Sequence, residues 1–61
     1  MIILNNFSEL QKLIKDTNEL ILDLANLSNQ DFIKTISFLI GLTYKNGNLI
    51  KLQSKVFKVI F

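Results

Sequence analysis

The chain has 61 residues, of which 49% are hydrophobic and 20% charged, so its composition is that of one globular domain. It contains no cysteine and no histidine, which excludes disulfides, thiolate nucleophiles, histidine bases and the usual zinc ligands. Seven lysines against five acids leave a net charge of +2, a small positive excess for a protein that would bind nucleic acid.

The short length makes stability depend on more than one small core. A domain of this size buries only about 60% of the surface that its unfolded chain exposes. Because no disulfide or His/Cys metal site can add stability, we expect a partner surface that does. No apolar stretch approaches the ~20 residues of a membrane-spanning helix, and the first residues lack the basic segment of a signal peptide. The sequence therefore predicts a protein of the cytoplasm or an equivalent compartment.

The first part of the chain predicts a strand, a helix and a second strand. Residues 1–4 form a short apolar run, and residues 19–24 contain a continuous apolar core, as in strands covered on both faces. Between them, residues 7–16 place their apolar side chains on one face of a helix, and Asn6 with Glu9 forms a capping box before it. A strand–helix–strand unit predicts that its two strands are parallel.

A second helix is predicted over residues 29–40. Ser28 is expected to cap its first turn, and Asp31 lies where the helix dipole favours an acid. Gly41 is expected to end this helix as the residue after its C-cap, in the left-handed conformation that glycine adopts easily.

The last third changes to the period of strands. Asn46 and Gly47 separate residues 42–45 from residues 48–52, which predicts a hairpin with a type I′ turn. A weaker turn at Gln53 and Ser54 leads to a last strand over residues 55–61. The resulting order is β-α-β-α-β-β-β. It predicts a two-layer α/β sandwich, in which two helices cover one face of a small mixed sheet.

These last strands are apolar on both faces. In the last strand, Val56 and Ile60 lie on one face and Phe57 and Val59 on the other. In the preceding strand, Ile50 and Leu49 also lie on different faces. An antiparallel sheet with one face in water shows a clean alternation of apolar and polar residues. Since the chain has no further element to cover the second face, we expect a second copy to cover it in a homodimer.

No group of residues predicts catalysis, a metal site or a cofactor. The acids are dispersed along the chain, the serines and threonines have no histidine base, and the two glycines belong to a helix end and a turn. We therefore expect a non-enzymatic protein with no cofactor. The acids are Glu9, Asp16, Glu19, Asp23 and Asp31.

Four lysines cluster in the last third, with two aromatic residues among them. One interpretation is a small basic α/β module that binds RNA through its strands. The other is ordinary solubilising charge, which also prevents pairing at exposed strand edges. The second interpretation is favoured, because the sequence has neither a pair of RNP-type aromatics nor a GXXG loop. The residues are Tyr44, Lys45, Lys51, Lys55, Phe57 and Lys58.

A longer pattern covers nearly the whole chain. It consists of residues 21–27 (ILDLANL), 32–34 (FIK), 36–41 (ISFLIG), Tyr44, 47–52 (GNLIKL) and 56–57 (VF), with 7–9 (FSE) before them. This pattern resembles the C-terminal core of the SepF family of cell-division proteins. The chain differs from the family at Lys34, Ser37 and Ile40, which stand for its usual Arg, Asp and Ser. The family's N-terminal amphipathic helix has no counterpart here, so we expect no direct membrane anchor in this chain.

The resemblance implies a single SepF-like core domain over residues 1–61. It implies a dimer that binds the C-terminal tail of the tubulin-like protein FtsZ and helps to bundle or anchor its filaments at the division site. The expected compartment is the cytoplasm or, given a composition typical of AT-rich genomes, the stroma of a plastid. By matched positions, Gly41 would lie at a self-association surface. Lys51 and Phe57 would bind the tail. Lys51 would pair with an acidic residue of the tail, and Phe57 would pack on an apolar one. Nucleic acid is not an implied partner.

Overall fold

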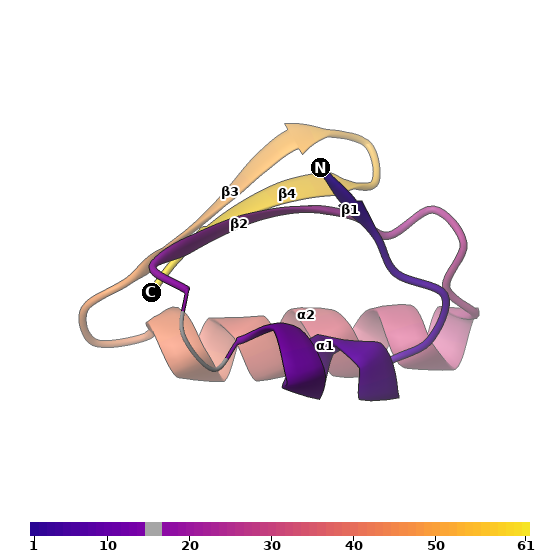
Figure 1. Ribbon diagram of the computed structural model, residues 1–61, viewed down its shortest axis with the longest axis horizontal. Helices are drawn as coiled ribbons and strands as arrows, with labels where there is room; N and C mark the ends of the chain where they lie inside the picture. Colours follow the sequence, from indigo (N-terminus) through magenta and orange to yellow (C-terminus); the bar gives the residue numbers. More distant parts are fainter. Residues whose placement is uncertain (15–16) are drawn as a thin grey trace.

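The computed structural model describes residues 1–14 and 17–61 and shows a four-stranded sheet with both helices on one face (Figure 1). This confirms the predicted fold class, a two-layer α/β domain with a mixed sheet. The strand order is β1-β2-β4-β3; β1 is parallel to β2, and β4 is antiparallel to both of its neighbours. The elements are β1 (Ile2–Ile3), α1 (Ser8–Leu13), β2 (Glu19–Asp23), α2 (Asn29–Thr43), β3 (Asn48–Gln53) and β4 (Val56–Ile60).

Both predicted helix starts are confirmed by their hydrogen bonds. The Glu9 amide donates to Asn6 Oδ1 at 3.2 Å, and Glu9 Oε1 accepts from the Asn6 amide at 3.2 Å, which is the reciprocal pattern of a capping box. Ser28 Oγ accepts from the Asp31 amide at 3.2 Å at the start of α2. The Asp31 carboxylate also accepts from the Phe7 amide at 3.1 Å, so it links the beginnings of the two helices. The last predicted residues of the first helix, 15 and 16, lie outside the described residues.

The predicted strand over residues 42–45 is wrong, because α2 continues to Thr43 and Tyr44 keeps helical angles, with φ −56° and ψ −44°. Gly41 therefore lies inside α2 and does not end it. Neither glycine has a positive φ, so the type I′ turn at Asn46–Gly47 does not form. Helical spacing explains the extension, since Leu39 and Thr43 lie one turn apart and are both buried. Burial of this face outweighs the local turn preference.

Gly47 has a different role from the one predicted for it. Its amide donates to the Thr43 carbonyl at 3.1 Å, directly after the end of α2. A Cβ at Gly47 would overlap the carbonyl oxygen of Ile60 and would lie 3.0 Å from Thr43. Glycine is thus required here because the chain must pass close to β4, and not because of an unusual φ.

The strand β3 pairs with β4 and not with the residues before Gly47. Lys51 lies opposite Phe57, Ile50 opposite Lys58 and Leu49 opposite Val59, while Leu52 is the extra residue of an irregularity between Lys51 and Gln53. The predicted hairpin register, with Lys51 opposite Leu42, is therefore wrong. The predicted faces of the last strand are confirmed. Phe57 and Val59 pair with the buried Leu22 and Leu20 of β2, and Lys58 lies on the other face opposite Ile21.

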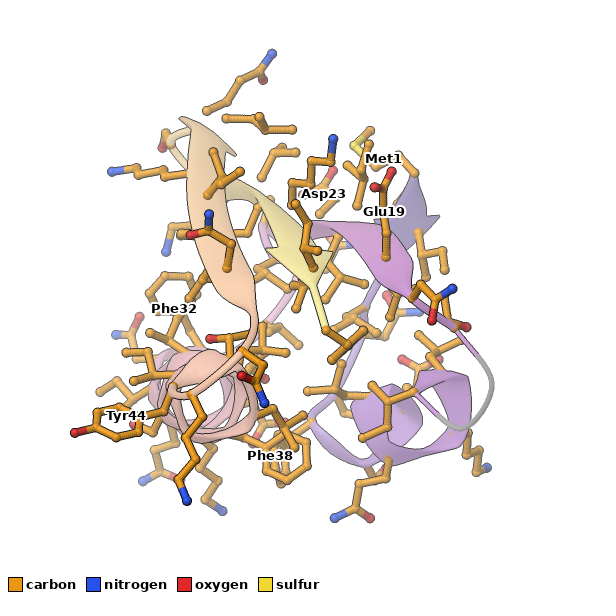
Figure 2. All side chains as sticks on the ribbon, turned by 90° about the vertical axis from the view of Figure 1, so that its left-hand side faces the viewer. Met1, Glu19, Asp23, Phe32, Phe38 and Tyr44 are labelled. Atoms are coloured by element: carbon orange, nitrogen blue, oxygen red, sulfur yellow. The ribbon has the colours of Figure 1, made fainter. Side chains whose placement is uncertain are left out.

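The core lies between the sheet and the two helices. Leu10 of α1 and Leu39 of α2 are completely buried against the sheet. The rings of Phe7 and Phe38 meet edge to face, with centroids 5.6 Å apart, and Figure 2 shows Phe38 between the helices on the side away from the sheet. The buried hydrophobic residues are Leu4, Leu10, Leu20, Leu22, Leu24, Leu39 and Val59.

Thr35 is a buried polar residue in this core. It is 0% exposed, and its hydroxyl has no hydrogen-bond partner among the described residues. We expect Thr35→Val to stabilise the fold by about 1 kcal/mol, because it removes an unsatisfied buried hydroxyl at constant shape. Urea denaturation measures the change. Thr43→Val is the matched control, since Thr43 Oγ1 donates to the Leu39 carbonyl at 2.8 Å and its removal brings no gain. Equal effects at the two positions would contradict this explanation.

Candidate functional site

The structure brings Lys51 and Phe57 together as direct partners across β3 and β4. Phe57 is half-buried and packs against the core, whereas Lys51 is exposed beside it. Both belong to the sheet face that the helices cover, at the end of the sheet nearest the β3–β4 turn. The two residues that the resemblance implied for peptide binding are therefore neighbours at the edge of the core.

Two residues that the sequence did not assign to this site complete it. The ring of Phe32, in the first part of α2, lies 6.4 Å from the ring of Phe57 at an angle of 52°. Lys55 Nζ lies 4.0 Å from the centre of the Phe32 ring, a cation–π contact. Figure 2 shows Phe32 above α2 on the side where β3 runs. We call Phe32, Lys51, Lys55 and Phe57 the basic–aromatic cluster.

The other lysines of the last third lie elsewhere. Lys58 is on the opposite sheet face, where its Nζ lies 3.8 Å from Glu19 Oε2. Lys45 follows α2, at the other end of β3 from Lys55. Tyr44 is 82% exposed at the end of α2, and Figure 2 shows its ring pointing away from the helix and the sheet. The fold therefore does not gather these lysines and Tyr44 into one basic surface.

Gly41 lies on the outer surface of α2. Nothing lies within 4 Å of the position that a Cβ would take. Exposed residues on this side of the helix include the apolar Ile33 at 64% and Ile40 at 51%, and also the polar Ser37 and Lys34, which lie about one and two turns before Gly41. An exposed glycine inside a helix costs about 1 kcal/mol relative to alanine, and neither the backbone nor the packing of this chain requires one here. We call Ile33, Ile40, Gly41 and Tyr44 the outer helix face.

A second exposed apolar surface lies on the side of the sheet that faces away from the helices. Ile3 is 54% exposed and Ile50 38% exposed. Charges of both signs lie among the apolar residues, and Figure 2 shows Glu19 and Asp23 on this side of the sheet. We call this surface the open sheet face; its residues are Ile3, Glu19, Ile21, Asp23, Ile50, Val56, Lys58 and Ile60.

Comparisons with known proteins give no relative from which a role could be transferred: no family model and no curated protein matches the chain. Neither helix in residues 1–14 and 17–61 is long and apolar enough to cross a membrane. The same residues contain no enclosed pocket and no group of acids that could hold a metal ion.

Proposed function

We propose that this protein is a non-enzymatic, self-associating module of cell division that binds the C-terminal tail of FtsZ through Lys51 and Phe57. One observation carries the proposal: these residues, implied by the resemblance to the SepF family, are cross-strand partners at an accessible edge of the core. The half-buried ring supplies an apolar anchor, and the neighbouring ammonium supplies a partner for a carboxylate. Such an arrangement suits a peptide that carries one apolar side chain and an acid.

The open sheet face supports self-association. Its apolar side chains have no cover within the described chain, and a small core gives the monomer little stability to spare. Lys58 lies beside Glu19 at the centre of this face. When two copies pack through this face about a two-fold axis, Lys58 of one copy can lie close to Glu19 of the other. We propose that two copies dimerise through this face.

The outer helix face supports a further contact between dimers. Gly41 presents bare backbone on a surface that also carries exposed apolar side chains, which permits the close approach of another helix. This surface lies on the opposite layer of the molecule from the open sheet face (Figure 1). A protein with two such faces can join dimers into larger assemblies, which is what bundling of filaments requires.

We expect Phe57→Leu and Lys51→Glu each to weaken binding of the FtsZ tail peptide by about tenfold. Leucine is preferred to alanine at this position because Phe57 packs against the core, so that truncation would also cost stability. Isothermal titration with the tail peptide measures the affinities, and circular dichroism checks the fold. Co-sedimentation with FtsZ, with and without its tail, tests the interaction with filaments.

Lys12→Glu and Phe38→Leu are the matched controls, because both residues lie outside the basic–aromatic cluster. Binding should respond weakly to salt, whereas RNA binding would weaken steeply as salt rises. If folded Phe57→Leu and Lys51→Glu variants bind the tail as tightly as the wild type, the proposed site is wrong. If wild-type protein neither binds the peptide nor co-sediments with FtsZ, the proposed function is wrong.

A further inference from the structure

Lys55 holds a fixed place at the tip of the β3–β4 hairpin. Its carbonyl accepts a hydrogen bond from the Leu24 amide at 2.7 Å, which attaches the turn to the end of β2. Its side chain reaches across to α2, where the ammonium lies 4.0 Å from the centre of the Phe32 ring. This contact restricts a side chain that would otherwise be mobile, so the charge of Lys55 has a defined position before any ligand arrives.

The cluster thus presents two cations beside two aromatic rings. Lys51 lies next to Phe57, Lys55 lies over Phe32, and the two rings are in contact with each other. Over residues 1–14 and 17–61, no carboxylate lies within ion-pair distance of either lysine. Both lysines are exposed, and their ammonium groups can pair with a carboxylate of another molecule.

We propose that the basic–aromatic cluster recognises a peptide with two acids, one for Lys51 and one for Lys55, separated by an apolar side chain that rests on Phe32 and Phe57. This inference rests on the proposed function and extends it, since it adds Phe32 and Lys55 to the site and specifies the chemistry of the bound segment. The rings contribute apolar contact, and the two charges fix the direction and register of the peptide.

The test uses peptides that differ by a single charge. The probes are a short synthetic peptide with Asp on both sides of a central Leu and its two analogues, in each of which one Asp is Asn. The two-acid peptide is expected to bind the wild-type protein about fivefold more tightly than either analogue. Lys55→Met should remove the gain in affinity that one of the two acids provides. Lys51→Met should remove the gain that the other acid provides. Such a double-mutant cycle assigns each acid to its lysine.

Two further variants separate this site from general charge effects. Lys12→Met removes an exposed lysine of α1 and should leave all three affinities unchanged. Phe32→Leu keeps an apolar side chain but removes the ring that positions Lys55, so it should reduce the advantage of the second acid by about half or more. Circular dichroism and urea denaturation confirm that each variant is folded.

Equal binding of the one-acid and two-acid peptides overturns the inference, as does a Lys55→Met variant in which both acids keep their full advantage. Failure of the wild-type protein to bind the two-acid peptide overturns it as well. The FtsZ tail peptide, titrated in parallel, distinguishes a failure of this inference from a failure of the proposed function. If it binds through Lys51 and Phe57 while Lys55→Met has no effect, the proposed function stands and the second cation does not. If only the synthetic peptide binds, the partner is another acidic protein.

Discussion

Gly47→Ala is expected to destabilise the fold by about 3 kcal/mol, whereas Gly41→Ala is expected to stabilise it by up to about 1 kcal/mol. The same substitution has opposite signs because the two glycines meet different surroundings. At Gly47 the new methyl group would overlap the Ile60 carbonyl oxygen, and both the end of α2 and β4 would have to move. At Gly41 the methyl group points into open space, and alanine is the better helix former.

Urea denaturation of the two variants and the wild type measures this difference. The measurement is repeated at several protein concentrations, because the stability of a dimer depends on concentration. A destabilised Gly41→Ala variant would show that the position needs glycine within the monomer. If Gly41→Ala is more stable but assembles less, the glycine serves the contact between molecules. A fully stable Gly47→Ala variant would contradict the close approach seen between α2 and β4.

Ile50→Glu is expected to weaken the dimer by about 2 kcal/mol or more while the monomer keeps its fold. The substitution places a carboxylate opposite Lys58, its cross-strand partner, so the two charges can pair within one sheet. In a dimer built on the open sheet face, the same carboxylate would replace an apolar contact at the interface. For the wild-type protein, the melting temperature should rise with protein concentration.

Analytical ultracentrifugation of the wild type and the variant tests this expectation. Ile33→Glu is the matched control, because it adds the same charge to the outer helix face and leaves the sheet unchanged. It should preserve the dimer and reduce only larger assemblies. A wild-type protein that stays monomeric, with a melting temperature unchanged over a wide range of dilution, would exclude the dimer. If Ile50→Glu dimerises normally, the open sheet face is not the interface.

Features that depend on neighbouring residues could be predicted from the sequence. The capping box at Asn6 and Glu9 and the cap at Ser28 need only a few side chains and amides close along the chain. The alternation in the last strand separates the two sheet faces, because side chains of a strand alternate strictly. Local geometry sufficed in each of these cases.

The end of α2 could not be predicted in the same way. The buried side of this helix includes Thr35 and Thr43, and a search for apolar periodicity passes over threonines. Without them the apolar stripe ends near Leu39, and Asn46–Gly47 then predicts a hairpin. The structure shows that burial against the sheet continues through Thr43, whose hydroxyl is satisfied by the Leu39 carbonyl.

The candidate site was predictable only in part. The resemblance singled out Lys51 and Phe57, but the pairing that joins them depends on the register of β3 with β4, which the sequence left open. The expected turn at Asn46–Gly47 instead paired Lys51 with Leu42. The contact of Lys55 with Phe32 joins a hairpin turn to the start of a helix. No periodicity in the sequence indicates a contact between separate layers, so this pair becomes visible only in the folded chain.

The position of β4 in the sheet has a consequence for synthesis on the ribosome. This strand is the last element along the chain, yet it lies between β2 and β3. Until residues 56–60 leave the exit tunnel, β2 lacks one neighbour and β3 has none, and the apolar residues of both strands stay accessible. The nascent chain therefore completes its sheet in one late step, by a pairing between distant segments. Before that step, the unpaired edges of β2 and β3 can pair with other chains, which favours aggregation.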